Sequence, residues 1–298
     1  MFLHMNVIIS YPERVENIKE KIRNDGPESL HVLADFDRTL TYAAVNGVKT
    51  SSIISLLRDG NHLTQGYAEK AHALFNTYHP IELDPSIPVE EKKKTMEIWW
   101  ETHNRLLIKS GLSYADLEDI VGNGHVKFRE GVSEFLDFLH TYQIPLIIFS
   151  ASGCGEAVRM FFQKIQKDYP NIFYVTNQFN WDENGRAIST KGVIIHSFNK
   201  DETLLEEIPE VYKAIQLRSN VILLGDSMGD VGMIEGFAYH ALLKVGFLNS
   251  DTGVLKKEYE NNFDIILEGD GDFSYVNKLM KDIVSAQNIS PPSLIIRN

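Results

Sequence analysis

The sequence predicts an α/β fold, with a doubly wound parallel-sheet core into which a helical cap domain is inserted. Three observations support this prediction. Apolar runs alternate with helical patterns through the second half of the 298-residue chain, as they do when helices cover both faces of a parallel sheet. Several of these runs end in Asp or Ser. A block of almost purely helical pattern, from about residue 50 to 126, interrupts the series after the first run.

The composition limits the class of protein. The chain is 43% hydrophobic, which is enough for a packed core, and its net charge of -12 disfavours nucleic-acid polymers, whose phosphates need clustered Lys and Arg. Cys154 is the only cysteine, which fits a reducing compartment. The first residues lack the basic and apolar regions of a signal peptide, and the apolar runs are shorter than a bilayer span, so we expect neither a signal peptide nor a membrane helix. We expect a cytoplasmic monomer that binds no nucleic-acid polymer and no membrane.

The first elements are a short apolar segment, an amphipathic helix and a buried strand. In the helix, at residues 14–22, Val15, Ile18 and Ile22 recur on one side. The strand, "LHVLADF" at residues 30–36, is apolar at successive positions, so we expect it to be buried on both faces of the sheet.

Helical spacing dominates from about residue 50 to 126. We predict that residues 44–127 form the cap on a core made of residues 1–43 and 128–298. Ser113 and Asp116 have the spacing of a capping box at the start of one cap helix. Charge runs such as "EEKKK" are typical of solvated helix faces. The predicted cap helices cover residues 64–78, 89–111 and 113–121.

The second half of the chain supplies the rest of the core. Asn184-Gly185 is a hairpin-turn signal between two strand-like flanks. We expect helices at residues 129–142, 155–169 and about 201–217, and strands at 144–152, 171–179 and 191–198 and within 220–230, 241–247 and 263–269.

Polar residues follow the apolar runs at the edge where such sheets bind ligands. Asp35 and Asp37 follow the first strand, Ser150 follows "LIIF", and Asp226 and Asp230 follow "VILLG". Two neighbouring carboxylates repel each other unless a cation relieves the repulsion. Four acids at adjacent strand ends suit Mg²⁺, which binds oxygen ligands and can draw a phosphate into an acidic protein.

These residues can perform phosphoryl transfer. One carboxylate can attack phosphorus and form an aspartyl-phosphate, while the other protonates the leaving oxygen and then activates water. Ser150, nearby backbone N–H groups and Lys200 can hold the phosphoryl oxygens.

Four segments, in order, resemble the motifs of the haloacid-dehalogenase-like (HAD) phosphohydrolases: "DFDRT", "FSAS", "NK" and "GDSMGD". "YHPIELDP", "EIWWETHN", "FREG" and "KVGFLN" resemble a narrower group, the cytosolic 5'-nucleotidase III family of pyrimidine 5'-nucleotidases. The likeness runs from about Val7 to Glu268. All four motifs in order are far more specific than one short motif alone.

The resemblance implies a role for each site residue. Asp35 would be the nucleophile and a metal ligand, and Asp37 the general acid/base with its backbone carbonyl on the metal. Asp226 would bind the metal directly, and Asp230 would support the metal site. Ser150, the Ala151 backbone and Lys200 would hold the phosphate, and Glu82 in the cap would contact the nucleoside.

The cap sequence leaves the base open. Trp99 and Trp100 point about 100° apart on a helix, so we expect one in the core and one stacked on a nucleobase, without knowing which. His103 falls where relatives usually carry a small residue, so it is either a base contact or a surface residue. Arg38 occupies a variable motif position that we cannot interpret.

The resulting prediction is a Mg²⁺-dependent 5'-nucleotidase. It would hydrolyse pyrimidine nucleoside monophosphates or 7-methylguanosine monophosphate through an aspartyl-phosphate. A phosphatase for another small phosphomonoester, such as phosphoserine, and a non-catalytic nucleotide-binding protein are the alternatives.

Overall fold

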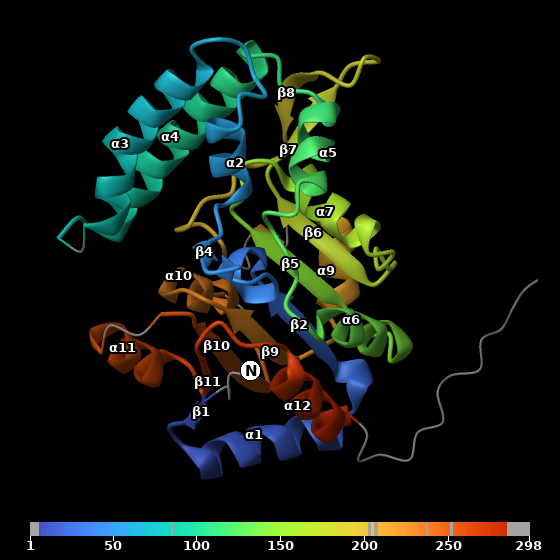
Figure 1. Cartoon of the computed structure of the whole chain (residues 1–298). Helices are drawn as coiled ribbons and strands as arrows, with labels where there is room; N and C mark the ends of the chain where they lie inside the picture. The colour runs from blue at the N-terminus through green and yellow to red at the C-terminus, as the bar shows by residue number, and fades with distance from the viewer. Residues whose placement is uncertain are drawn as a thin grey trace, which may run out of the picture.

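A seven-stranded sheet forms the centre of the protein (Figure 1). The computed structural model describes residues 6–84, 86–201, 204–205, 208–236, 238–250 and 253–284. The strands are β1 (Asn6–Ile9), β2 (Leu30–Ala34), β5 (Leu146–Ser150), β6 (Ile172–Thr176), β9 (Asn220–Gly225), β10 (Ala241–Leu248) and β11 (Ile265–Glu268). Their order is β1-β11-β10-β9-β2-β5-β6. Only β1, at one edge, pairs antiparallel; the other pairs are parallel.

Helices cover both faces of this sheet. In β2, Val32 and Ala34 pack on one face and Leu33 packs on the other, so the strand is buried on both sides. This burial explains its continuous apolar sequence, and the predicted doubly wound α/β fold is confirmed. The helices on the first face are α1 (Pro12–Asp25), α6 (Val132–Thr141), α7 (Gly155–Lys164) and α12 (Ser274–Val284); those on the second are α9 (Pro209–Ile215), α10 (Met228–Val231) and α11 (Val254–Asn262).

The block inserted after β2 is helical, as the sequence predicts. It contains α2 (Ile53–Asp59), α3 (Tyr67–Leu83), α4 (Val89–Lys109) and α5 (Tyr114–Gly122), with α3 and α4 side by side (Figure 1). The capping box is present, because Asp116 N donates to Ser113 Oγ at 3.4 Å and Ser113 N donates to the Asp116 carboxylate at 2.8 Å. A short hairpin, β3 (Ala44–Val45) and β4 (Val48–Lys49), precedes the helices; the sequence did not indicate it.

A second hairpin joins the core to the cap. It consists of β7 (Gln178–Trp181) and β8 (Ala187–Lys191), and its turn contains Asn184-Gly185 as predicted. Ala187 N donates to Leu112 O at 2.9 Å, so the hairpin is hydrogen-bonded to the segment that leads into α5. The cap limits of 44 and 127 remain a prediction.

The strand expected at residues 191–198 is wrong. The β8 strand ends at Lys191, and Gly192, with φ of 73°, turns the chain away. Beyond it, the Asn177 side chain replaces a strand partner: its Oδ1 accepts from Ile195 N at 2.8 Å and its Nδ2 donates to Ile195 O at 2.8 Å. The apolar Ile195 is buried without being in a strand.

Two other elements differ from the prediction. The segment at residues 171–179 forms two strands, β6 and the start of β7, which belong to different sheets. In the helix expected at about 201–217, residues 204–205 are helical, but α9 begins only at Pro209, which has no N–H to continue a preceding helix, and ends at Ile215. Residues 202–203 and 206–207 lie outside the described residues. No described helix is long and apolar enough to cross a membrane.

Candidate active site

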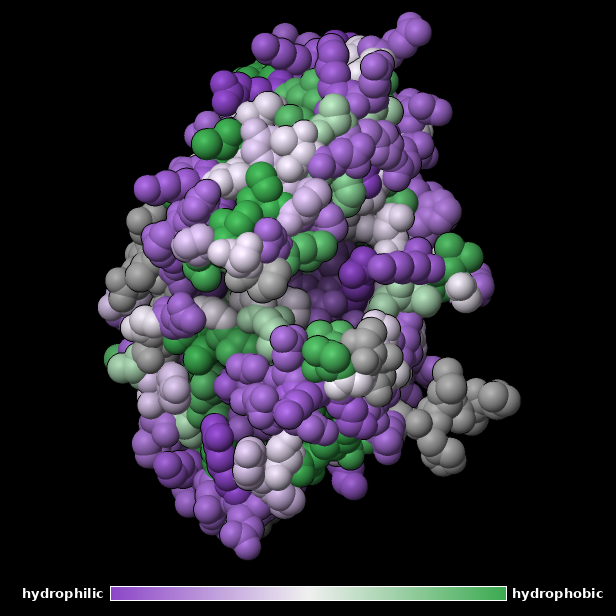
Figure 2. All heavy atoms as spheres, turned by 90° about the vertical axis from the view of Figure 1, so that its left-hand side faces the viewer, coloured by the Kyte–Doolittle hydropathy of each residue, from purple (hydrophilic) through white to green (hydrophobic). Residues whose placement is uncertain are grey.

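A cavity of about 710 Å³ lies between the cap and the carboxyl ends of the strands. Figure 2 shows a hydrophilic hollow on this face of the molecule. Ser150 and Ala151 are not among the residues that line the cavity. The other predicted site residues all line it: Asp35, Asp37, Glu82, Trp99, Trp100, His103, Lys200, Asp226 and Asp230.

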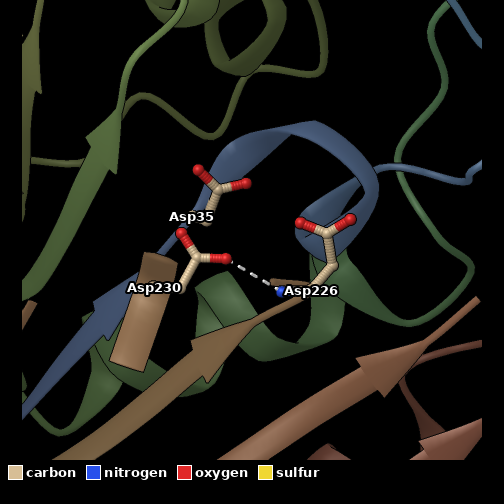
Figure 3. Close-up of side chains that lie close together, drawn as sticks. All are labelled: Asp35, Asp226 and Asp230. Atoms are coloured by element: carbon tan, nitrogen blue, oxygen red, sulfur yellow. Dashed lines mark hydrogen bonds between the residues drawn. The ribbon is translucent and has the colours of Figure 1, made fainter. Parts of the chain in front are cut away.

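Three carboxylates meet at one end of the cavity. Asp35 follows β2 and Asp226 follows β9, and these strands are neighbours, with Asp35 N donating to Leu224 O at 3.0 Å. Asp230 reaches the same point from α10 (Figure 3). One carboxylate oxygen from each of the three acids lies within 4.8 Å of the others. The side chain of Asp37 is not part of this cluster.

Lys200 forms a buried ion pair with two of these acids. Its Nζ donates to Asp35 Oδ1 at 2.6 Å and to Asp230 Oδ1 at 3.1 Å. Burial alone would lower the pKa of Lys200, but attraction to Asp35 and Asp230 outweighs burial and raises this pKa above its ordinary value. Lys200 therefore stays positively charged at the floor of the cavity.

Asp230 holds the loop after β9 in place. Its Oδ2 accepts from Asp226 N at 3.1 Å, Ser227 N at 3.0 Å and Ser227 Oγ at 2.8 Å. This approach requires a glycine at position 225, because a Cβ there would lie 2.5 Å from the Cβ of Asp230. With both carboxylate oxygens engaged, Asp230 is suited to orient the cluster.

The electrostatics of the cluster fit a divalent cation. Burial, together with repulsion from Asp230 and Asp35, raises the pKa of Asp226 well above its usual value. Burial also raises the pKa of Asp35 to about 7, against the opposing effect of Lys200. Among the described residues, no donor forms a hydrogen bond to the Asp226 carboxylate. Carboxylate oxygens whose mutual repulsion Lys200 relieves only in part can hold a hard metal cation.

A tight turn separates Asp37 from Asp35. Arg38 adopts the left-handed conformation, with φ of 60°. The turn is fixed by Arg129, which is 1% exposed and donates to Arg38 O at 2.6 Å and to Thr39 O at 2.9 Å. Burial raises the pKa of the Asp37 carboxyl to about 6. The acid is therefore easier to protonate than an ordinary Asp.

Ser150 lies at the carboxyl end of β5, beside β2, and is 1% exposed. Its Oγ accepts from Ser152 N at 3.2 Å. It does not cap α7, whose N-cap residue is Cys154. The phosphate-binding roles of Ser150 and Ala151 remain predictions.

Aromatic side chains form the cap wall of the cavity. Trp99 is 8% exposed and stacks on Tyr78, with ring centroids 5.8 Å apart. Trp100 is more exposed and stacks on His103 at 5.9 Å. The Trp100 ring also packs on Gly153 of the core, where a Cβ would lie 2.6 Å from Cζ3. Trp99 is thus the core residue of the pair, and Trp100 is the one with more free surface.

His103 is not a surface residue, so that alternative is wrong. It is 3% exposed and its Nε2 lies 3.0 Å from the Tyr67 hydroxyl. Burial lowers the pKa of His103 to about 4, which keeps the ring neutral.

Glu82 connects the cap to the core. Its Oε1 accepts from Ser197 Oγ at 2.6 Å, and its backbone carbonyl accepts from Lys92 Nζ at 2.8 Å. Ser197 lies three residues before Lys200 in the loop that carries this lysine. Glu82 therefore lies where the cap meets the floor of the cavity.

The residues lining the cavity that the sequence interpretation missed include Arg58, Phe75 and His79. Phe75 and His79 share the face of α3 that carries Glu82, at spacings of four and three residues, so helical periodicity could have identified them. Arg58, on α2, had no comparable signal.

Comparison with known proteins identifies the family. Residues 38–284 match the family model described as "Pyrimidine 5'-nucleotidase (UMPH-1)". The 7-methylguanosine phosphate-specific 5'-nucleotidases of Mus musculus and Homo sapiens are both 33% identical over 279 residues, covering 93% of this chain and 92% of each relative.

Solved structures agree with this assignment. Cytosolic 5'-nucleotidase IIIB bound to cytidine superimposes with a TM-score of 0.83 at 29% identity, covering 93% of both chains. A probable phosphoserine phosphatase from Vibrio cholerae, with a TM-score of 0.54 at 12% identity over 89% of this chain and 69% of its own, shares the fold. The chain belongs to the pyrimidine 5'-nucleotidase (UMPH-1) family of haloacid-dehalogenase-like enzymes.

Proposed function

We propose that the protein is a Mg²⁺-dependent 5'-nucleotidase that hydrolyses nucleoside 5'-monophosphates, with pyrimidine nucleotides as the preferred class. The observation that carries this proposal is the cavity itself. One end holds clustered carboxylates and a buried lysine, and the other end is lined by aromatic rings. A nucleotide has the matching polarity, with an anionic phosphate at one end and a flat base at the other.

Asp35 is the proposed nucleophile. Its Oδ attacks phosphorus, the P–O5' bond breaks, and Asp37 gives its proton to the departing nucleoside oxygen. Asp37 then takes a proton from water, whose oxygen attacks the phosphorus and releases Asp35 and inorganic phosphate. The raised pKa of Asp37, about 6, makes its protonated form accessible near neutral pH, where the ionised form is also populated.

The proposed Mg²⁺ site is formed by the carboxylates of Asp35, Asp226 and Asp230 and by the backbone carbonyl of Asp37. When bound, the ion would neutralise charge on the phosphoryl oxygens. Lys200 would hold one of those oxygens, together with Ser150 and the Ala151 backbone. At the other end, the exposed part of the Trp100 ring would stack on the base.

The cap wall disfavours the alternative substrate. Phosphoserine offers no flat ring to the stacked Trp100 and His103. The likeness to a phosphoserine phosphatase is one of fold alone. The cytoplasmic location, which the cytosolic name of a structural relative supports, and the monomeric state remain predictions.

Replacement of Asp35 by Asn tests the nucleophile and the non-catalytic alternative together. We expect turnover of cytidine monophosphate to fall by at least about 10³-fold, because the amide cannot attack phosphorus. Borohydride added during wild-type turnover should reduce the acyl phosphate, and peptide mass spectrometry should locate the change at Asp35. Asp119→Asn, which removes an exposed carboxylate of α5, is the control. Turnover by Asp35→Asn within tenfold of wild type, or no modification of Asp35, would contradict the proposal.

A further inference from the structure

Arg58 places a buried positive charge at the cap end of the cavity. It lies on α2, lines the cavity and is 9% exposed. Its guanidinium carbon lies 4.6 Å from the centroid of the Phe75 ring. Phe75 also lines the cavity, so Arg58 and this ring belong to the same wall. The hydrolysis mechanism proposed above does not use Arg58, and the family resemblance assigns no role to it.

The guanidinium keeps donors for a ligand. Its Nη2 donates to Ser55 Oγ at 3.1 Å, and its Nε lies 3.5 Å from Asp59 Oδ1, whose side chain is 52% exposed. No other hydrogen bond from Arg58 is found among the described residues. A guanidinium has five N–H groups in a planar fork, so several remain for a molecule in the cavity.

Arg58 serves the base end of the cavity. It lies over Phe75, whose ring contacts Trp99 edge-to-face at 6.2 Å. Trp99 in turn stacks on Trp100, with ring centroids 6.0 Å apart. Lys200, by contrast, pairs with the carboxylates of Asp35 and Asp230. A nucleotide whose phosphate lies at Lys200 therefore presents its base to the wall of Trp100, His103 and Arg58.

We propose that Arg58 determines base specificity: it donates to a carbonyl oxygen of an uncharged base, such as O2 of cytosine or uracil, and disfavours the cationic 7-methylguanine. This inference rests on the proposed function and narrows its substrate class. Two positive charges brought together out of water repel each other, while an Arg donor to a carbonyl oxygen is favourable. The inferred preference for an uncharged base would distinguish this chain from the relatives that are named for 7-methylguanosine phosphate.

The aromatic rings of the wall cannot favour a neutral base over a cationic one. Cations stack favourably on Trp, so Trp100 alone would accept a cationic base at least as well as a neutral one. The Phe75 ring already has Arg58 over it. The charge of the base is therefore read by Arg58.

Two substitutions separate the charge of Arg58 from its size. Arg58→Met keeps the length of the side chain without its charge, and Arg58→Lys keeps the charge. The substrates are cytidine monophosphate, guanosine monophosphate and 7-methylguanosine monophosphate; the last two differ by one methyl group and the charge it brings. We expect the kcat/KM ratio of 7-methylguanosine to guanosine monophosphate to rise at least tenfold in Arg58→Met and to stay within threefold in Arg58→Lys.

Arg105→Met, which removes an exposed arginine of α4 outside this cavity, is the matched control and should leave all three values unchanged. The binding constants of guanosine and 7-methylguanosine can be measured by titrating the protein with each nucleoside and following its tryptophan fluorescence. The ratio of these constants reports the preference for the uncharged base without any turnover. A ratio within twofold of wild type in Arg58→Met, by kinetics and by binding, would overturn the inference. Absence of turnover with every nucleotide would instead overturn the proposed function, and the binding ratio would still decide the role of Arg58.

Discussion

At the scale of single residues, Arg129 fixes the turn that carries the proposed acid/base. Its guanidinium carbon lies over the rings of Tyr42, at 5.5 Å, and Phe247, at 4.8 Å. It donates to the carbonyls of Arg38 and Thr39, to Asn249 after β10 and to Asp270 after β11. One buried side chain therefore ties three loops at the carboxyl edge of the sheet. Backbone carbonyls that the left-handed turn at Arg38 leaves without regular partners find donors there.

Removal of this side chain should be strongly destabilising. In Arg129→Met, the Thr39 carbonyl loses the donor Arg129 Nε, and Arg38 O and the Asp270 carboxylate each lose one of their donors. We therefore expect the free energy of unfolding to fall by about 3–5 kcal/mol. Arg129→Lys should lose less, because it keeps the charge but not the planar fork. Urea unfolding measures both. Arg105→Met, whose Glu101 partner is also exposed, should change the free energy by less than about 1 kcal/mol; equal losses at the two positions would refute the role of Arg129.

The candidate site was predictable where chemistry coincides with a strand end. Asp35 and Asp226 follow apolar runs, and a parallel sheet brings such positions together. Arg129 and Arg58 were not predictable in this way. The partners of Arg129 are mostly backbone carbonyls, which sequence does not distinguish, and the position of Arg58 depends on how α2 packs in the cap.

At the scale of elements, the local sequence pattern predicted the helices better than it predicted where strands begin and end. The capping box of Ser113 and Asp116 is encoded within four residues and was read correctly. The expected strand at residues 191–198 failed because Asn177, distant in sequence, satisfies the backbone of Ile195. An apolar run shows that a segment is buried, but the hydrogen-bond partner decides whether it is a strand.

The end of β9 depends on a glycine. In Gly225→Ala, the new methyl group would lie 2.5 Å from the Asp230 Cβ and push that side chain from Lys200 and the Asp226 loop. We expect the free energy of unfolding to fall by about 1–3 kcal/mol. We also expect the Mg²⁺ concentration for half-maximal activity to rise at least tenfold, as measured by metal titration.

A second glycine provides the control for this change. Gly122, at the end of α5, has open space where a Cβ would lie. Gly122→Ala should be neutral or slightly stabilising, because alanine favours the helix and restricts the unfolded chain. If Gly225→Ala behaved like Gly122→Ala, the close approach of Asp230 would not matter for the metal site.

At the scale of the whole molecule, the sequence determined the layers but not their order. Burial on both faces and the inserted helical block follow from composition and spacing. The strand order, the antiparallel β1 at the edge and the contact of the β7–β8 hairpin with the cap depend on pairing between distant segments. Such pairing leaves no periodic signal in one sequence.

Buried neutral histidines make the stability of the whole fold depend on pH. Burial lowers the pKa of His31, His103 and His196 to about 4, from an ordinary value of 6.5. His31, on β2, is 1% exposed and its Nδ1 lies 2.9 Å from Arg218 O, so the neutral ring donates there. Between pH 6.5 and 4 the unfolded chain binds protons that the folded chain does not. Stability contributed by these groups is therefore present above pH 6.5 and is lost as the pH falls.

His31→Asn isolates one of these groups, because the asparagine amide can still donate to Arg218 O. Between pH 7.5 and 5, we expect the wild-type free energy of unfolding to fall by about 2 kcal/mol more than that of the variant, the linkage expected for one buried histidine. For His125→Asn, at an exposed position, the free energy of unfolding should fall over this pH range by the same amount as that of the wild type. Urea unfolding at several pH values gives these slopes, and the comparison cancels the opposing titration of the active-site acids, which all three proteins share. Parallel slopes for His31→Asn and wild type would show that His31 is protonated as easily in the folded protein as in the unfolded chain.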